Sequence, residues 1–167
     1  SRAKALAAEL ESQARNPSVR TRAAQVLSQI DKVEDFITAW QVAGPYTDPE
    51  QGQSLFANAF PPEKDDGKVS WHPLLAAKAD SPWMLDLQAA LTGEHRVGYA
   101  RTWVFSEKAQ PARIEFGTDD GNKLWLNGEI VHQVDRGGAA APGAFTPAVT
   151  LRQAWNVLRF TVIQDTG

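Results

Sequence analysis

The sequence predicts a mainly β protein, a β-sandwich that follows a short N-terminal α-helical hairpin. Three observations predict it. The first 30 residues carry apolar side chains at helical spacing, whereas later segments alternate apolar and polar residues between Gly- and Pro-rich turns. No helical pattern separates these later segments, so we expect an antiparallel sheet. Six or more short strands with long connections favour a sandwich of the jelly-roll type.

The composition is that of one globular protein rather than of two large domains. The chain has 167 residues, a net charge of -3 and 43% hydrophobic residues, which suits one domain with a core and a short appendage. It offers no basic surface for nucleic acid or anionic lipid. No apolar stretch approaches the length of a membrane span. The chain has no Cys, which excludes disulfides and thiolate sites.

Residues 2 to 30 are expected to form two helices. Leu6, Leu10 and Ala14 recur every four residues, the period of one helix face. Pro17 interrupts the pattern and is suited to the first turn of a second helix. The apolar stripe of that second helix consists of Val19, Ala23, Val26, Leu27 and Ile30. We therefore expect a helical part over residues 1–33 and the sandwich over residues 34–167.

The strands are expected in six segments of alternating residues, namely 97–105, 113–116, 123–126, 130–134, 149–151 and 157–162. In the last segment, Leu158, Phe160 and Val162 share one side of the strand, which we expect to be buried. Asn127 and Gly128 separate two of the segments. They predict a type I′ turn, because both central positions of that turn require a positive φ.

The segment that is informative about function runs from Phe116 to Gly128. Its acidic loop, which consists of Asp119, Asp120, Gly121 and Asn122, precedes an apolar strand that contains Trp125. This pattern resembles the signature of PA14-like and galactose-binding-like β-sandwich modules, over residues 38–164 of this chain. It is also similar to the jelly-roll sugar-binding domain of glycoside hydrolases related to β-galactosidase. The resemblance implies a jelly roll that binds carbohydrate.

The same resemblance implies a metal site. In sugar-binding PA14 adhesins the matching acidic pair is joined by a cis peptide bond, which turns both carboxylates to one side. Asp119 and Asp120 are therefore the predicted ligands of a calcium ion, which prefers oxygen donors, and sugar hydroxyls would complete its shell. The alternative is that the two carboxylates cap backbone N–H groups of their own turn, as Asp commonly does.

Exposed aromatic rings are the second requirement for sugar binding, because the apolar face of a pyranose packs on an indole. Trp71 and Trp125 adjoin loops and are the predicted stacking residues. In the segment 97–105, alternate residues from Tyr99 to Phe105, including Trp103, share one face. That face is either a binding sheet or the interior of the sandwich, and the sequence leaves both open.

Arg136 lies in a loop of small residues, 135–143, and can donate paired hydrogen bonds to a carboxylate or to vicinal hydroxyls. The complete set of predicted ligand-binding residues is Asp119, Asp120, Gly121, Asn122, Trp125, Trp71 and Arg136. The sequence carries no nucleophile, nucleotide-binding or zinc-binding motif, so an enzyme is not the preferred interpretation.

The hypothesis from the sequence is a non-catalytic carbohydrate-binding accessory module, with calcium as an optional ion, in a larger secreted or periplasmic bacterial protein. Residues 40–46 and 60–64 are similar to the opening of accessory modules in such proteins. Residues 16–30 resemble the second helix of a HEAT-like repeat, which implies the tail of a helical array; a helical hairpin that packs on the following domain is the alternative. The alternative function is a structural or protein-interaction spacer without a glycan ligand.

Overall fold

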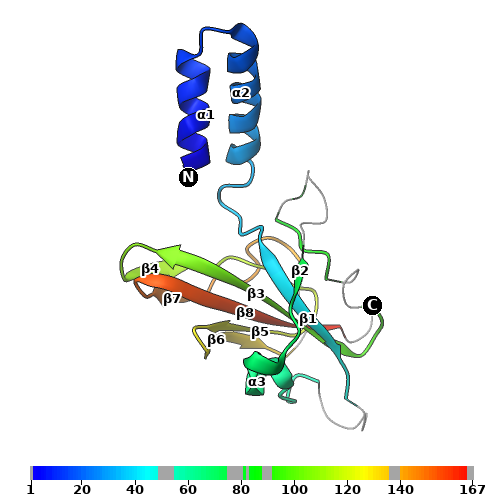
Figure 1. Ribbon diagram of the computed structural model, residues 1–167. Coiled ribbons are helices and arrows are strands. Elements are labelled where there is room, and N and C mark those ends of the chain that lie inside the picture. The colour runs from blue at the N-terminus through cyan, green and yellow to red at the C-terminus, as the bar shows by residue number, and fades with distance from the viewer. Residues whose placement is uncertain are drawn as a thin grey trace. The chain divides into compact units, whose positions relative to one another are not determined.

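The computed structural model describes residues 2–48, 55–74, 81, 83–87, 92–135 and 140–164. The chain divides into two compact units. The first contains the chain up to Thr38 together with a segment that ends at Met84, and the second begins at Ala39 and contains the strands (Figure 1). Within the described ranges, no helix is both long and apolar enough to span a membrane.

Two helices, α1 (Arg2–Gln13) and α2 (Pro17–Asp31), form the predicted hairpin. Asn16 is the N-cap of α2, and its side-chain oxygen accepts a hydrogen bond from the Ser18 N–H at 2.9 Å. This bond satisfies a backbone donor that the first turn of a helix leaves unpaired. The local sequence therefore sets where the second helix begins.

The apolar stripes predicted for these helices are only partly buried. Ala7 and Ala23 are buried, whereas Leu6 is 57% and Leu10 is 41% exposed. Two helices share one interface, so apolar residues on their other faces stay in contact with water. Ala7 and Ala23 are buried in the hairpin, whereas Val26, Leu27 and Ile30 of the second stripe are half-buried.

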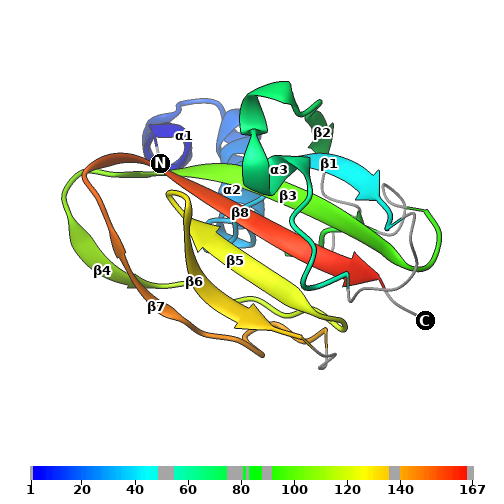
Figure 2. The same cartoon turned by 90° about the horizontal axis from the view of Figure 1, so that it is seen from below.

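The second unit contains eight strands among the described residues, in two antiparallel sheets. The large sheet has the order β2-β1-β3-β8-β5-β6, and β4 pairs with β7 in the small one. The strands are β1 (Trp40–Tyr46), β2 (His72–Leu74), β3 (Arg96–Ser106), β4 (Gln110–Arg113), β5 (Asn122–Leu126), β6 (Glu129–Val134), β7 (Ala148–Leu151) and β8 (Ala154–Gln164). Figure 2 shows β4 and β7 on one side of the large sheet and α3 (Pro61–Lys64) on the other. The predicted fold class, a mainly β sandwich after a helical hairpin, is confirmed.

All six predicted strand segments overlap observed strands, but the segment 113–116 does so only at Arg113 and is misplaced. The regular strand there is β4, which ends at Arg113. Beyond it, the Ile114 N–H donates to the Pro147 carbonyl at 3.1 Å, and Phe116 exchanges hydrogen bonds with Phe145 at 3.0 and 2.9 Å. The chain stays paired but leaves the regular ladder. Sequence patterning placed the strand on the apolar residues, whereas the ladder begins at the polar Gln110.

The turn between β5 and β6 is as predicted. Asn127 has a φ of 54° and Gly128 a φ of 92°, the left-handed values that a type I′ hairpin requires. The Asn127 side chain also accepts a hydrogen bond from the Val157 N–H at 2.9 Å. The turn is thereby tied to the neighbouring strand β8.

The main core lies between the two sheets. Leu158 and Phe160 face it from β8, as the alternation predicted, and are 2% and 9% exposed. Ala100 of β3, Leu124 of β5 and Val149 of β7 complete the buried cluster from both layers. Because side chains alternate along a strand, the odd-numbered residues of β3 and β8 lie on the opposite, outer face of the large sheet.

One end of this outer face is covered by residues 55–71, which include α3 and the short helix η1 (Asp66–Lys68). We call these residues the strap. Phe56 and Phe60 of the strap pack on a second cluster that contains Tyr99 of β3 and Trp125 of β5. The large sheet is therefore buried on both sides at the strap end.

A buried polar network holds the strap on the sheet. The Tyr99 hydroxyl donates to Glu63 Oε1, and Lys123 Nζ lies 3.6 Å from Glu63 Oε2. Arg159 donates to the carbonyl of Pro62. Burial, together with the neighbouring Glu63 carboxylate, raises the pKa of Tyr99, so the hydroxyl stays protonated and remains a donor.

Candidate functional site

The predicted acidic loop leads into β5. Asp119 is exposed and Asp120 is half-buried, whereas Gly121 and Asn122 are buried. Asn122 Nδ2 donates to Thr118 Oγ1 at 2.7 Å, and that hydroxyl donates to the backbone carbonyl of Asp120 at 2.9 Å. Asn122 is therefore used inside the loop, and Asp119 is the exposed member of the set, whereas Asp120 has a further interaction within the fold.

The calcium site predicted for the loop has two carboxylates, those of Asp119 and Asp120. The described part of the chain contains no group of three or more His, Asp or Glu side chains that could hold a metal ion, whereas Ca²⁺ takes about six to eight oxygen ligands. The cis peptide bond recorded among the described residues joins Gly44 to Pro45. The bond between Asp119 and Asp120 is thus trans and differs from the geometry that the resemblance implied.

Of the predicted stacking residues, Trp125 lies under the strap and Trp71 is the last residue of the strap. Trp125 is 4% exposed, and the Arg159 guanidinium lies 4.8 Å from the centre of its ring. Trp71 is half-buried. Arg136, the last member of the predicted set, lies outside the described residues. Trp125 therefore offers no open ring face of the kind that a sugar stacks on, whereas Trp71 keeps part of its surface exposed.

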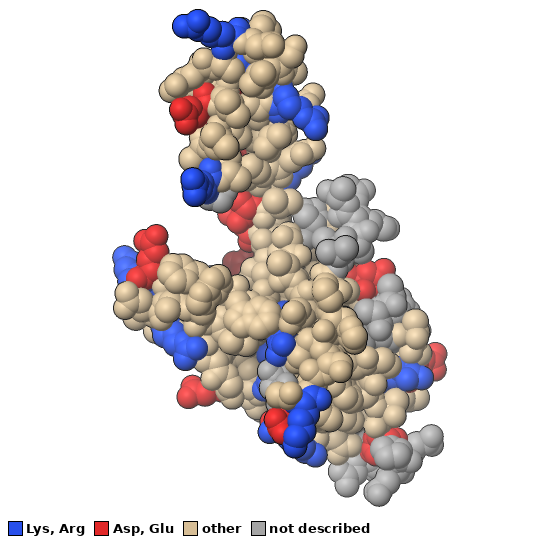
Figure 3. Space-filling view, in the orientation of Figure 1, with Lys and Arg blue, Asp and Glu red and all other residues tan. Residues whose placement is uncertain are grey.

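Three other aromatic residues are exposed on the outer face, beyond the strap. Trp103 is 42%, Phe105 is 55% and Trp155 is 58% exposed. We call these three residues the aromatic platform. Phe105 and Trp155 are direct partners in the β3–β8 register, and their ring centres lie 5.3 Å apart in an edge-to-face arrangement. Figure 3 views this face, where uncharged side chains dominate over β3 and β8.

The sheet itself positions the platform. Trp103 and Phe105 alternate along β3 with Thr102 and Val104, which face the core side of the sheet. The same alternation turns Trp155 outward at the beginning of β8. The sequence indicated that Trp103 and Phe105 share one face of their strand. It did not indicate whether that face lies in the core or on the surface of the protein. The pairing with β8 places these rings on the outer face. They remain exposed because the strap, which ends at Trp71, covers the other end of that face.

An arginine borders the platform. The Arg101 guanidinium lies over the rings of Trp71, at 4.1 Å, and of Trp103, at 5.0 Å. Its Nε donates to Gln41 Oε1 of the adjacent strand β1 at 3.0 Å. Cation–π contacts of this kind hold both the guanidinium and the indole in a defined orientation.

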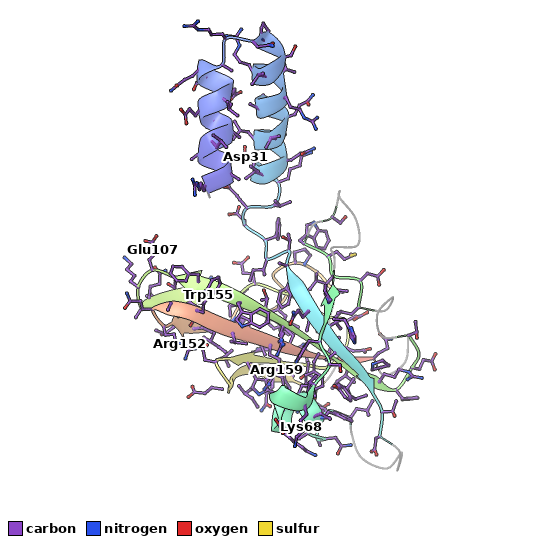
Figure 4. All side chains as sticks on the ribbon, viewed as in Figure 1. Asp31, Lys68, Glu107, Arg152, Trp155 and Arg159 are labelled. Atoms are coloured by element: carbon purple, nitrogen blue, oxygen red, sulfur yellow. The ribbon has the colours of Figure 1, made fainter. Side chains whose placement is uncertain are left out.

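The acidic loop and the platform lie at different ends of the large sheet. Asn122 pairs with Val162 of β8, and Phe105 pairs with Trp155 of the same strand. Seven residues separate the two positions on β8, which corresponds to about 23 Å at 3.3 Å per residue. Figure 4 shows Trp155 towards the β4–β7 end of β8 and Arg159 nearer to α3. The fold therefore does not bring the predicted loop and the exposed rings into one site.

Comparison with known proteins gives no family assignment. No family model matches the chain, and no curated protein matches it. Similar solved structures include a family 35 carbohydrate-binding module from Clostridium thermocellum, with 23% identity and a TM-score of 0.34 over 42% of this chain and 63% of that chain. They also include the β-glucuronidase of Faecalibacterium prausnitzii, with 18% identity and a TM-score of 0.44 over 76% and 20% of the two chains.

A further similar structure is the β-glucuronidase of an uncultured Clostridium species, with 13% identity and a TM-score of 0.41 over 75% of this chain and 21% of that chain. The chain thus spans less than two thirds of the carbohydrate-binding module and about a fifth of the two glucuronidases. TM-scores of this size assign neither a fold family nor a function.

Proposed function

We propose that this chain is a non-catalytic carbohydrate-binding accessory module of a larger secreted protein, and that the aromatic platform is its binding surface. The observation that carries the proposal is the exposure of Trp103, Phe105 and Trp155, at 42%, 55% and 58%, side by side on two paired strands. Contiguous exposed apolar patches on a protein surface mark interaction or ligand-binding sites.

The chemistry of the platform suits sugars. Indole and phenyl faces pack against the apolar C–H face of a pyranose, and polar groups at the border fix the hydroxyls. The central strands of a sheet hold the rings rigidly, so little conformational entropy is lost when a ligand binds. The platform consists of aromatic rings without an acid or a nucleophile, so the role we propose is binding and not bond cleavage.

The experiment is a pull-down of the full chain on insoluble polysaccharides together with a glycan array, each with and without calcium. A variant with Trp103→Ala, Phe105→Ala and Trp155→Ala is expected to bind its glycans at least about tenfold more weakly, since each lost aromatic contact contributes roughly 0.5–1.5 kcal/mol. The matched control is Trp83→Ala, because Trp83 is 40% exposed but does not belong to the platform. It should bind like the parent chain.

A second variant separates the platform from the loop. If Asp119→Ala with Asp120→Ala abolishes binding while the platform variant retains it, the ligand binds at the acidic loop and calcium removal should have the same effect. If the parent chain retains no glycan at all, the alternative of a structural or protein-interaction spacer replaces the proposal. Exposed apolar residues of the first unit, such as Phe36 at 42% and Met84 at 45%, would then be the next surface to test.

A further inference from the structure

The charged side chains that β3, β5 and β8 turn to the outer face are all basic: Arg101, Lys123 and Arg159. Glu63 of the strap pairs with Lys123 and accepts from Tyr99, so its carboxylate is engaged at the strap end. Arg101 and Arg159 oppose each other directly in the β3–β8 register. Like charges in that position repel.

Arg159 is committed to the fold, whereas Arg101 borders the platform. Arg159 donates to the Pro62 carbonyl and lies over the buried ring of Trp125. The Arg101 guanidinium lies 5.0 Å from the ring centre of Trp103, which is 42% exposed. A ligand that stacks on Trp103 therefore comes next to a fixed positive charge.

We propose that the aromatic platform selects glycans whose sugars carry carboxylates, that is uronate-containing chains, over their neutral counterparts, and that Arg101 contacts the carboxylate. This inference rests on the carbohydrate-binding function proposed above. A guanidinium matches a carboxylate through two parallel N–H donors, and such charge-assisted hydrogen bonds are about twice as strong as neutral ones. A hydroxyl in the same place forms only a neutral bond.

The geometry supplies the donors. Gln41 accepts from Nε of Arg101 at 3.0 Å, and the other donors of the side chain are on its two terminal nitrogens. Arg101 has additional interactions within the fold. Because a guanidinium has five N–H donors, it can contact a protein group and a ligand carboxylate together, so the inference does not depend on an unpaired arginine.

The test uses one polymer in two charge states: polygalacturonic acid, and the same polymer after chemical reduction of its carboxyl groups to alcohols. Affinities are measured for the full chain by affinity electrophoresis at low and at high salt. We expect the acidic form to bind about tenfold more tightly at low salt, because hydrogen bonds to a charged group are stronger than neutral ones but are partly screened by water at this surface. The preference should shrink at high salt.

Two variants, Arg101→Met and Arg101→Lys, test whether Arg101 is the residue that contacts the carboxylate. The control is Arg152→Met, because Arg152 is an exposed arginine that donates to the backbone carbonyl of Trp155. Arg101→Met should equalise the two polymers, Arg101→Lys should retain a small preference, and Arg152→Met should behave like the parent. An unchanged melting temperature verifies that each variant is folded; if Arg101→Met does not fold, Arg101→Lys decides.

The outcomes distinguish this inference from the function on which it rests. Equal binding of both polymers, with platform-dependent binding of neutral glycans, overturns the selection for carboxylates and leaves the proposed function in place. A preference that survives Arg101→Met, or that disappears in Arg152→Met, overturns the assignment to Arg101. Failure of the parent chain to bind any glycan overturns both.

Discussion

The ion pair that holds the strap gives the sharpest prediction about stability. Glu63 and Lys123 are 3.6 Å apart, and their side chains are only 12% and 9% exposed. At an effective dielectric constant of about 20, two unit charges at this distance attract by roughly 4–5 kcal/mol. Breaking a buried pair by removing one partner costs about 3–5 kcal/mol, because the other charge is left without compensation.

Glu63→Gln is the informative change. The amide keeps an oxygen that can accept from the Tyr99 hydroxyl, so the substitution removes the charge with little loss of shape. We expect the free energy of unfolding to fall by about 3 kcal/mol, and Lys123→Met to lower it by a similar amount. The double variant should recover most of the loss, since it leaves no unpaired charge.

The assay is urea unfolding followed by tryptophan fluorescence, because Trp125 lies 5.8 Å from Lys123 Nζ and reports on this region. At 2–4 °C per kcal/mol for chains of this size, the single variants should also melt about 6–12 °C lower. Tyr99→Phe serves as a control that removes the hydroxyl and keeps both charges. The reasoning is refuted if Glu63→Gln and the double variant are equally unstable, because the charge would then contribute nothing.

Three further predictions concern the sandwich. Gly117→Ala should destabilise by about 1–3 kcal/mol in urea melts, because an added Cβ would lie 2.0 Å from the backbone oxygen of Ala141; a neutral result would show that this loop adjusts freely. Asn156→Leu should lower the free energy of unfolding by about 3 kcal/mol or more, as measured by thermal unfolding. The reason is that the fully buried Asn156 side chain accepts from the Arg152 N–H at 2.9 Å and donates to the Arg152 carbonyl at 2.9 Å. Burial lowers the pKa of His132, so the unfolded chain binds the proton more readily than the folded chain. The stability of the fold should therefore decrease as the pH falls below about 6.5. In His132→Phe, the melting temperature should depend less on pH in this range.

Local sequence features predicted the parts of the fold that depend on neighbours in the chain. Pro17 marks the start of α2, and Asn127 with Gly128 marks the β5–β6 turn, because helix starts and tight turns depend on the dihedral preferences of a few residues. Alternation predicted the inward face of β8 through Leu158 and Phe160. The strand at β4 was misplaced because its pairing with β7 does not follow its apolar residues.

The candidate site was predicted only in part. The sequence identified an aromatic face on β3 that contains Trp103 and Phe105, but its preferred stacking residues were Trp71 and Trp125. Trp125 is covered by the strap, whose position depends on contacts between Glu63 and residues 36 and 60 positions away in the chain, Tyr99 and Lys123. Sequence spacing carries no information about such contacts. The calcium site at Asp119 and Asp120 remains a prediction for the binding measurements.

By itself, the sequence determined that this protein is a helical hairpin followed by an antiparallel sandwich, and which side chains share each strand face. Those properties follow from the periods of 3.6 and 2 residues and from turn chemistry. The tertiary structure decided which face is covered and which rings remain in water. That decision depends on where the strap packs, because burial is a property of the surfaces that long-range contacts bring together and not of the residue types that compose them.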